Sequence, residues 1–397
     1  MTKASRPGPA PIPAFLLVLG LIGVAYNLRP ALASVAPLLA EIRADLGLGT
    51  AMAGVLTTLP VLCLGLFGPA APRLAGRFGP ERAIMLALAI IGGGILLRTL
   101  GGSGLLFAGT AVAGAGIGIA GVLLPGLVKQ HFPGRAGLMT GLYTMTLCMG
   151  AASAIAGSVP LALDFGGWRP ATLFWCLPAL VAMVLWLPQL RAARPRPADR
   201  AAPAPPPLWR DPVAWQVTGF LGLQSALAYA VFGWLPTILR DLGFGAVEAG
   251  FISSLSILSQ MATALLIPLA AGRRGQQRPL VLLVMGLTLL GFAAITLGPA
   301  WAVLPAAIVL GFGQGGTFGL GLTLIVLRAP NAETASRLSG MAQSFGYTMA
   351  ALGPFGTGLL HDLSGDWLAP TLGFALIALL ATACGLGAGR AVTVAAN

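Results

Sequence analysis

The sequence predicts an all-α membrane protein whose twelve transmembrane helices form two parallel six-helix repeats. Three observations support this fold class: the composition, the regular succession of apolar runs, and an internal repeat. Of the 397 residues, 57% are hydrophobic and only 9% are charged. An ordinary soluble domain has roughly 45–50% apolar and about 25% charged residues. The composition therefore indicates an integral membrane protein.

The apolar runs have the length needed to cross a bilayer, about 20 residues each. Breaks at glycine, proline and charged residues place them near 13–38, 50–72, 82–100, 104–129, 135–162, 168–190, 213–239, 246–271, 279–298, 301–328, 335–361 and 367–389. The first run is too long for the core of a signal peptide, so we expect a retained helix. A segment rich in Arg, Pro and Ala follows the sixth run and has too few apolar residues to form a core. We therefore expect an N-terminal bundle at 1–190, a cytoplasmic linker at 191–212 and a C-terminal bundle at 213–397.

The basic residues predict the orientation of the helices. With both termini in the cytoplasm, the loops on that side contain Lys3, Arg6, Arg73, Arg77, Arg82, Lys129, Arg135, Arg191, Arg194, Arg196, Arg200, Arg210, Arg273, Arg274, Arg278, Arg328, Arg337 and Arg390. The other side has only Arg43, Arg98, Arg169 and Arg240. Cytoplasmic loops carry an excess of Lys and Arg. We expect a multi-pass protein of a bacterial inner membrane with both termini cytoplasmic.

The two halves of the chain repeat each other at a nearly constant spacing. At an offset of 196, the residues Asp45, Gly47, Pro72, Gly76, Arg77, Gly79 and Arg82 match Asp241, Gly243, Pro268, Gly272, Arg273, Gly275 and Arg278. Six spans per half is an even number, so both halves enter the membrane from the same side. The halves are therefore predicted to be parallel repeats about an axis along the membrane normal.

Other protein classes fit the sequence poorly. The net charge is +12, but the basic residues form short clusters between apolar runs, so no nucleic-acid partner is expected. The cysteines lie in apolar segments without metal-ligand spacing, at Cys63, Cys148, Cys176 and Cys384. The glycine series from Gly114 to Gly118 lies in an apolar run with no preceding strand, which indicates close helix packing and not a nucleotide loop. No Walker loop or catalytic triad is recognisable, so we expect no enzyme activity, cofactor or metal.

Arg29 is the most informative single residue, because it lies near the middle of the first apolar run. An arginine at the centre of a span costs on the order of 2.5–3.5 kcal/mol. The eleven acidic residues all lie outside the apolar interior of the predicted spans. We therefore expect Arg29 to face a polar cavity and to bind an anionic or strongly dipolar substrate. The alternative is that Arg29 holds backbone carbonyls at a helix break caused by Pro30.

Two parallel six-helix repeats, a basic central loop and a basic turn after the second span resemble the major facilitator superfamily. Within it, four segments are similar to the cyanate and 2-nitroimidazole transporter family: Asn27–Pro30, Arg135–Gly141, Gly222–Ser225 and Trp234–Pro236. The turn departs from the superfamily's loop signature, because Pro72 replaces a glycine and Gly76 replaces an aspartate. The segment from Gly150 to Gly157 lacks the proline of the signature of proton-coupled drug exporters, which disfavours drug export.

The resemblance implies that spans 1, 4, 7 and 10 line a central cavity, flanked by spans 2, 5, 8 and 11. These spans contain all four tyrosines of the chain and several glutamines. The candidate substrate-binding residues are Tyr26, Asn27, Arg29, Tyr143, Gln224, Tyr229, Gln260, Gln314, Gln343 and Tyr347. Hydrogen bonds between helices are the alternative role for each polar side chain. Near the cytoplasmic span ends, the candidates for a cytoplasmic gate that pairs with helix C-termini are Arg77, Arg135, Arg273 and Arg337.

The sequence thus leads to the hypothesis of a secondary transporter that works by alternating access. Its substrate is expected to be a small anion similar to cyanate, or a small planar polar compound, with Arg29 as the anchor. A multidrug or hydrophobic-compound exporter of the same superfamily is the alternative, disfavoured because the charge at mid-membrane is positive. We expect a monomer whose other partner is membrane lipid. Import, export, exchange, facilitated diffusion and proton coupling through a histidine all remain open.

Overall fold

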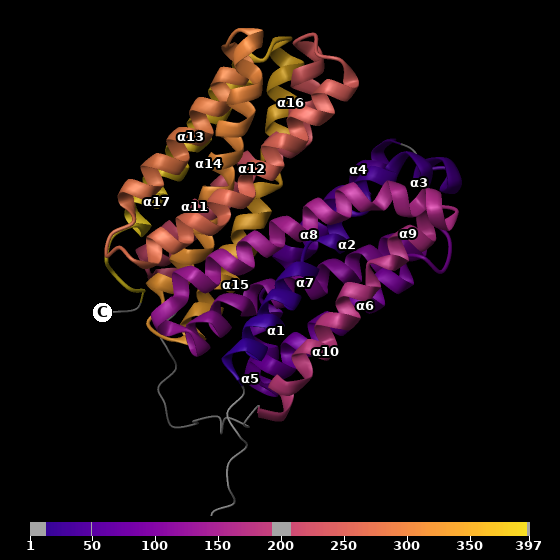
Figure 1. Ribbon diagram of the computed structural model, residues 1–397. Helices are drawn as coiled ribbons and strands as arrows, with labels where there is room; N and C mark the ends of the chain where they lie inside the picture. The colour runs from indigo at the N-terminus through magenta and orange to yellow at the C-terminus, as the bar shows by residue number, and fades with distance from the viewer. Residues whose placement is uncertain (1–12, 49, 193–207, 395–397) are drawn as a thin grey trace, which may run out of the picture.

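The described part of the chain is helical throughout. The structure is a computed structural model of the 397-residue protein, and it describes residues 13–48, 50–192 and 208–394, among which there is no strand. Figure 1 shows two bundles of helices that meet at one end and diverge toward the other. Most of the predicted linker, 191–212, lies outside the described residues, as do Lys3 and Arg6.

The helices follow the predicted spans closely. The first half contains α1 (Ala14–Asn27), α2 (Pro30–Ala33), α3 (Leu39–Leu46), α4 (Thr50–Phe67), α5 (Ala70–Phe78), α6 (Pro80–Leu97), α7 (Ser103–His131), α8 (Ala136–Phe165), α9 (Trp168–Phe174) and α10 (Cys176–Ala192). The second half contains α11 (Pro212–Asp241), α12 (Ala246–Gly272), α13 (Arg278–Leu297), α14 (Val303–Arg328), α15 (Ala332–Ala350), α16 (Leu352–Ser364) and α17 (Leu368–Ala388).

Four of the predicted spans are interrupted. The breaks fall between α1 and α2, α4 and α5, α9 and α10, and α15 and α16. A proline lies at or just after each break, at Pro30, Pro69, Pro178 and Pro354. Proline cannot donate to the carbonyl four residues earlier, and its ring clashes with that carbonyl, so it bends or ends a helix. The pair α4–α5 is bent by 53°.

The span at 335–361 differs most from its expected apolar character. Among the described residues, ten helical spans are long and apolar enough to cross a membrane, and the bent pair α4–α5 makes eleven. The remaining expected span corresponds to α15 and α16. It falls short because α15 carries buried polar side chains such as Ser339 and Gln343, and this helix packs against α4 and α7 of the other half. Its polar side chains therefore meet protein and not lipid.

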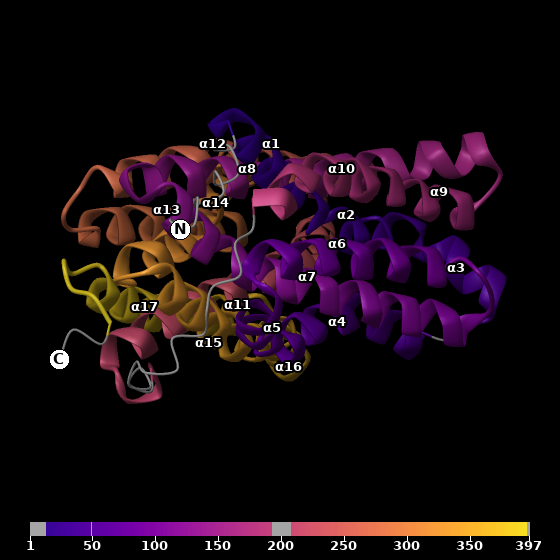
Figure 2. The same ribbon diagram turned by 90° about the horizontal axis from the view of Figure 1, so that it is seen from below.

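The halves meet at the basic end of the molecule, which we define as the end that carries Arg73, Arg77, Arg135, Arg273 and Arg337. There α8 crosses α12 so closely that a Cβ atom added to Gly137 would lie 2.8 Å from the Cα atom of Gly272. Likewise, a Cβ atom at Gly340 would lie 3.6 Å from Pro72 of α5. The view from below in Figure 2 shows the two bundles side by side, with α15 next to α5 and α7. At the opposite end, which carries α3 and α16, the bundles diverge (Figure 1).

The internal repeat also appears in the contacts at the opposite end. The indole nitrogen of Trp168 donates to the carboxylate of Asp45 at 3.0 Å. In the second half, the indole nitrogen of Trp367 donates to the carboxylate of Asp241 at 3.1 Å. Asp45 and Asp241 are a matched pair of the sequence repeat, so the two halves use the same bond at equivalent places.

Candidate functional site

The site is built around the break in the first span. Helix α1 ends at Asn27 and α2 begins at Pro30, with Arg29 as the N-cap of α2 at φ −120° and ψ −38°. The carbonyl of Arg29 accepts hydrogen bonds from the amides of Leu32 and Ala33. The break expected from Pro30 is therefore present. It leaves the Arg29 side chain at the joint between two short helical segments, at mid-depth of the bundle.

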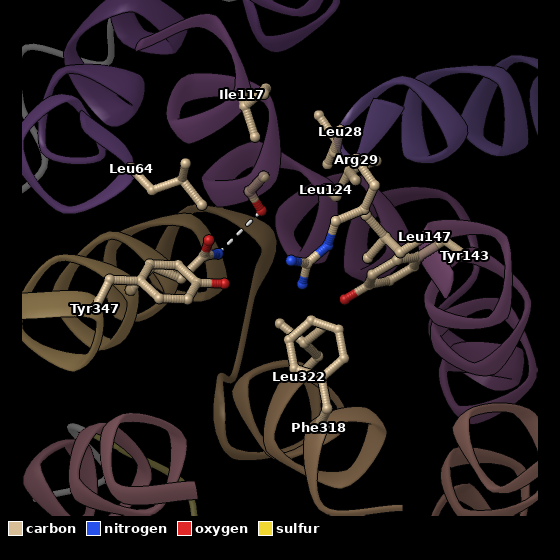
Figure 3. A pocket seen from close by; sticks show the side chains of 12 residues that line it. Leu28, Arg29, Leu64, Ile117, Leu124, Tyr143, Leu147, Phe318, Leu322 and Tyr347 are labelled. Atoms are coloured by element: carbon tan, nitrogen blue, oxygen red, sulfur yellow. Dashed lines mark hydrogen bonds between the residues drawn. The ribbon is translucent and has the colours of Figure 1, made fainter. Parts of the chain in front are cut away.

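Arg29 projects into a pocket between the two halves. The cavity has a volume of about 30 Å³, within about 390 Å³ of non-atom space that includes open solvent. It is lined by Leu28, Arg29, Leu64, Ile117, Gly121, Leu124, Tyr143, Leu147, Phe318, Leu322, Gln343 and Tyr347. The guanidinium carbon of Arg29 lies 5.3 Å from the centroid of the Phe318 ring, a cation–π contact across the halves. The Tyr229 side chain lies close enough to the Arg29 guanidinium to interact with it electrostatically. Figure 3 shows the guanidinium and the hydroxyl groups of Tyr143 and Tyr347 directed toward the same space next to Phe318.

Two features of this pocket favour a polar ligand. No carboxylate in the described part of the chain contacts Arg29, so its charge is not neutralised by the protein. The Tyr143 side chain is buried, and its hydroxyl has no hydrogen-bond partner among the described residues. A buried hydroxyl without a hydrogen-bond partner is costly, and so is a charge inside a membrane protein without a counter-charge. A ligand with hydrogen-bond acceptors could satisfy both groups.

Gln343 closes one wall of the pocket with a bond between the halves. Its side-chain nitrogen, on α15, donates to the backbone carbonyl of Gly121 on α7 at 3.0 Å, drawn as a dashed line in Figure 3. The same nitrogen also donates to the hydroxyl of Ser339 at 2.7 Å. The pocket therefore unites Arg29, Tyr143, Gln343 and Tyr347 of the predicted set, with Tyr229 in contact with Arg29.

Tyr26 and Asn27 point away from this pocket. The Asn27 amide donates to the carbonyls of Gly23 at 2.8 Å and Pro178 at 2.9 Å, which ties α1 to α10. The Tyr26 hydroxyl is hydrogen-bonded to the Ser153 hydroxyl at 2.6 Å, which ties α1 to α8. In this structure both residues thus have the helix-to-helix contacts that were the alternative to substrate binding.

The three other glutamines lie in the second half, outside the pocket lining. Gln224 accepts a hydrogen bond from Thr317 at 3.3 Å, between α11 and α14. The Gln260 amide nitrogen lies 3.4 Å from the Gln314 carbonyl oxygen, between α12 and α14. The Gln314 nitrogen is buried without a partner among the described residues. Gln314 is one helical turn from Phe318, so it lies next to the pocket along α14.

The arginines proposed for the gate lie at the basic end. Arg77, Arg135 and Arg273 are exposed and Arg337 is half-buried. Arg77 is in the last turn of α5, and Arg273 is the C-cap of α12. These positions favour an interaction with the carbonyl ends of those helices.

Two residues of this region were not predicted from the sequence. Phe318 faces Arg29, but an aromatic residue in an apolar span has no distinguishing signal apart from its place in a glycine-rich segment. Arg98 was assigned to the outer loops, yet its side chain is fully buried next to α2. Its signal was its position within the last residues of the predicted third span, 82–100.

Comparison with known proteins decides the family. The sequence model described as Major Facilitator Superfamily matches residues 15–354. The chain belongs to the major facilitator superfamily. It is therefore a multi-pass membrane transporter and not an enzyme, and the superfamily fold accounts for all twelve spans.

Relatives within the superfamily confirm the narrower resemblance. The chain is 44% identical to the 2-nitroimidazole transporter of Escherichia coli K12, over 94% of this chain and 95% of that protein. It is 41% identical to the uncharacterized transporter YycB of Bacillus subtilis 168, over 96% and 94%. It is 32% identical to the cyanate transport protein CynX of Escherichia coli K12, over 89% and 91%. Two of these relatives are thus named as transporters of 2-nitroimidazole and of cyanate.

Solved structures agree with the fold. The proton:xylose symporter XylE with bound 6-bromo-6-deoxy-D-glucose has a TM-score of 0.74 at 14% identity, covering 96% of this chain and 97% of that one. The transporter FucP in its outward conformation has a TM-score of 0.67 at 15% identity, covering 93% and 98%. At such low identity, these structures support only the fold of the chain.

Proposed function

We propose that this superfamily member is a secondary transporter of a small anion similar to cyanate, or of a small planar polar compound, with Arg29 as the substrate anchor. The observation that carries the proposal is the unneutralised guanidinium of Arg29 in a pocket between the halves. An anion there would form charge-assisted hydrogen bonds with it. The names of the relatives, a 2-nitroimidazole transporter and a cyanate transport protein, support substrates of this size.

The lining of the pocket combines an aromatic ring, aliphatic side chains and hydrogen-bonding groups. Phe318 offers a ring face, and leucine and isoleucine side chains form much of the lining. The hydroxyls of Tyr143 and Tyr347 and the amide of Gln343 are hydrogen-bonding groups around this apolar lining. Mostly apolar walls with a few polar groups are typical of small-molecule sites. A hydrated metal cation would find neither a carboxylate nor a favourable potential at this pocket.

Alternating access would proceed by rocking of the units 1–190 and 213–397 about the pocket. We propose that the basic end is cytoplasmic, because cytoplasmic loops are rich in Lys and Arg. The state described would then be closed toward the cytoplasm, with Arg77, Arg135, Arg273 and Arg337 at that gate, and substrate would reach Arg29 from the outside. One chain contains the whole pathway, which supports a monomer in the inner membrane.

Uptake into proteoliposomes tests the role of Arg29. Labelled cyanate and 2-nitroimidazole would be offered to the purified protein and to Arg29→Lys and Arg29→Ala variants. A hydrogen bond to a charged group contributes about 1.5–3 kcal/mol. We therefore expect Arg29→Ala to lower cyanate uptake by roughly 10- to 100-fold, and Arg29→Lys to retain part of it.

Arg240→Gln is the matched control, because it removes an exposed arginine near the end of α11. This variant should transport normally. If Arg29→Ala lowers only the melting temperature and leaves cyanate flux intact, Arg29 supports the helix break and does not bind substrate.

A further inference from the structure

Arg98 is an unusual residue for the interior of a membrane protein. Its side chain is 0% exposed at the end of α6. One terminal nitrogen donates to the backbone carbonyl of Ala31 at 2.6 Å, and the other to the hydroxyl of Ser34 at 3.0 Å. No carboxylate of the described residues contacts it. A buried cation without an acidic partner is expensive and indicates a function.

The bonds of Arg98 meet a need created by the helix break. Helix α2 ends at Ala33, so its last carbonyls lack a following helical turn. The carbonyl of Pro30 accepts from the amide of Ser34, whereas no backbone amide of the described residues donates to that of Ala31. Arg98 donates to one of them, at the negative end of the segment, where a cation is favourable. The side chain of Ser34, the C-cap residue, is held at the same time. A buried guanidinium therefore donates the hydrogen bond that a backbone amide would donate in a continuous helix.

The same short segment begins with Arg29. Arg29 is the N-cap of α2, and its carbonyl accepts from Leu32 and Ala33 within it. Arg98 holds the other end of these four residues against α6. A shift of Ala31 or Ser34 would therefore rotate the joint from which the Arg29 side chain projects. Because α2 is only one turn long, little else inside it resists such a rotation.

We propose that Arg98 is a positioning residue for Arg29 and sets the preference of the pocket for anions over neutral molecules. It fixes α2 so that the Arg29 guanidinium points at the ring of Phe318. It also places a second positive charge, which no carboxylate of the described residues contacts, against the segment that begins with Arg29. This inference rests on the proposed function, because it concerns the site at which Arg29 would bind substrate.

Arg328 provides a matched comparison inside the same molecule. It is also buried, at the end of α14, and it donates to the carbonyl of Val392 at 3.2 Å and to the side chain of Gln277. It lies at the basic end and holds the segment after α17, away from the pocket. Removal of Arg328 therefore reproduces the loss of a buried, hydrogen-bonded arginine without touching α2.

The experiment compares two substrates in Arg98→Gln, Arg98→Lys and Arg328→Gln. KM and maximal rate would be measured in proteoliposomes in mildly acidic buffer, where cyanate is an anion and 2-nitroimidazole is neutral. We expect Arg98→Gln to raise the KM for cyanate about tenfold, and that for 2-nitroimidazole by less than about threefold. In Arg98→Lys, which keeps the charge, the KM for cyanate should lie close to that of the original protein. Arg328→Gln should lower the melting temperature and leave the ratio of the two KM values unchanged.

Three results would overturn the inference. These are an equal rise of both KM values in Arg98→Gln, no recovery in Arg98→Lys, or the same change of ratio in Arg328→Gln. If Arg98→Gln does not fold, Ser34→Ala decides, because it removes one bond to Arg98 and keeps the charge. It should raise the cyanate KM about threefold, and an unchanged KM refutes the positioning role.

The Arg29 variants separate this test from that of the proposed function. If Arg29→Ala transports cyanate normally, the proposed function fails whatever Arg98 does. If Arg29→Ala loses cyanate transport while Arg98→Gln leaves the KM ratio at its original value, only the inference about Arg98 fails.

Discussion

At the scale of single residues, the sequence was informative where a side chain contradicts its surroundings. Arg29 stood out because a charge in an apolar run must have a reason, and the structure places it in the pocket. Asn27 was chosen together with Arg29, from the segment Asn27–Pro30, but residues two apart lie about 200° apart around a helix. It therefore points toward α10 when Arg29 points into the pocket. The direction of a side chain near a break needs coordinates, because the break changes the phase of the helix.

Phe318 is the opposite case, because nothing in the sequence distinguishes it and only its contact with Arg29 gives it a role. Cation–π contacts contribute about 0.5–1 kcal/mol when exposed and about 2 kcal/mol when desolvated. We expect Phe318→Leu to raise the KM for an anionic substrate by roughly 3- to 30-fold, because the guanidinium of Arg29 loses the ring against which it lies. Phe318→Tyr keeps the ring face and should remain close to the original protein. Uptake kinetics in proteoliposomes give both values, and equal kinetics for Phe318→Leu and the original protein would show that the ring does not hold Arg29.

At the scale of helices, the positions of the spans were predicted well and their interruptions only in part. The apolar runs mark where the chain crosses the membrane, since burial in lipid demands that composition. Proline marked the break near Pro30. The polar character of α15 has another cause, because this helix packs against α4 and α7 of the other half. A sequence shows that a helix is polar, and only the packing shows whether water, lipid or protein covers it.

The contact between α3 and α9 makes a prediction at this scale. Trp168 and Arg169 at the start of α9 donate to the carboxylate of Asp45 on α3, at 3.0 and 2.7 Å. The hydrogen bond from Trp168, followed by the ion pair with Arg169, lowers the pKa of Asp45 below its usual value of 3.8. A carboxylate with a lowered pKa stabilises the fold above the unfolded pKa, and this contribution is lost as the pH falls through the folded pKa.

We therefore expect Asp45→Asn to lower the melting temperature near neutral pH, with the difference from the original protein shrinking as the buffer is acidified below about pH 4. Thermal unfolding in detergent over a pH series would measure this. Asp241→Asn is the matched control. It keeps an acceptor for Trp367 and loses no ion pair, because Leu368 stands where Arg169 stands in the first half. A pH-independent difference for Asp45→Asn would mean that the charge of Asp45 contributes nothing to stability.

At the scale of the whole molecule, the fold could be predicted from the composition, the spacing of the apolar runs and the internal repeat. The conformational state, that is, which end of the transporter is closed, could not. A transporter sequence has to support closure at either end, so it contains no signal for the end that is closed in one structure. The glycines at the crossing of α8 and α12 entered the sequence analysis as part of a family motif and of the internal repeat. That they join the two halves, as Gly137 and Gly272 do, requires the arrangement in space.

Closure at the basic end can be tested by a covalent link between the halves. A Cβ atom added to Gly126 of α7 would lie 3.3 Å from the Cβ atom of Ser336 on α15, close to the spacing of about 3.5–4.5 Å found in disulfides. We expect Gly126→Cys with Ser336→Cys to form a disulfide on mild oxidation. This link would hold the basic end shut and stop rocking, so uptake should fall by at least about tenfold and return on reduction. Mass spectrometry would verify the bond, and the two single variants would show the effect of each cysteine alone. Oxidised protein that transports as fast as the reduced form would mean that these helices do not separate during the cycle, and that the halves move in another way.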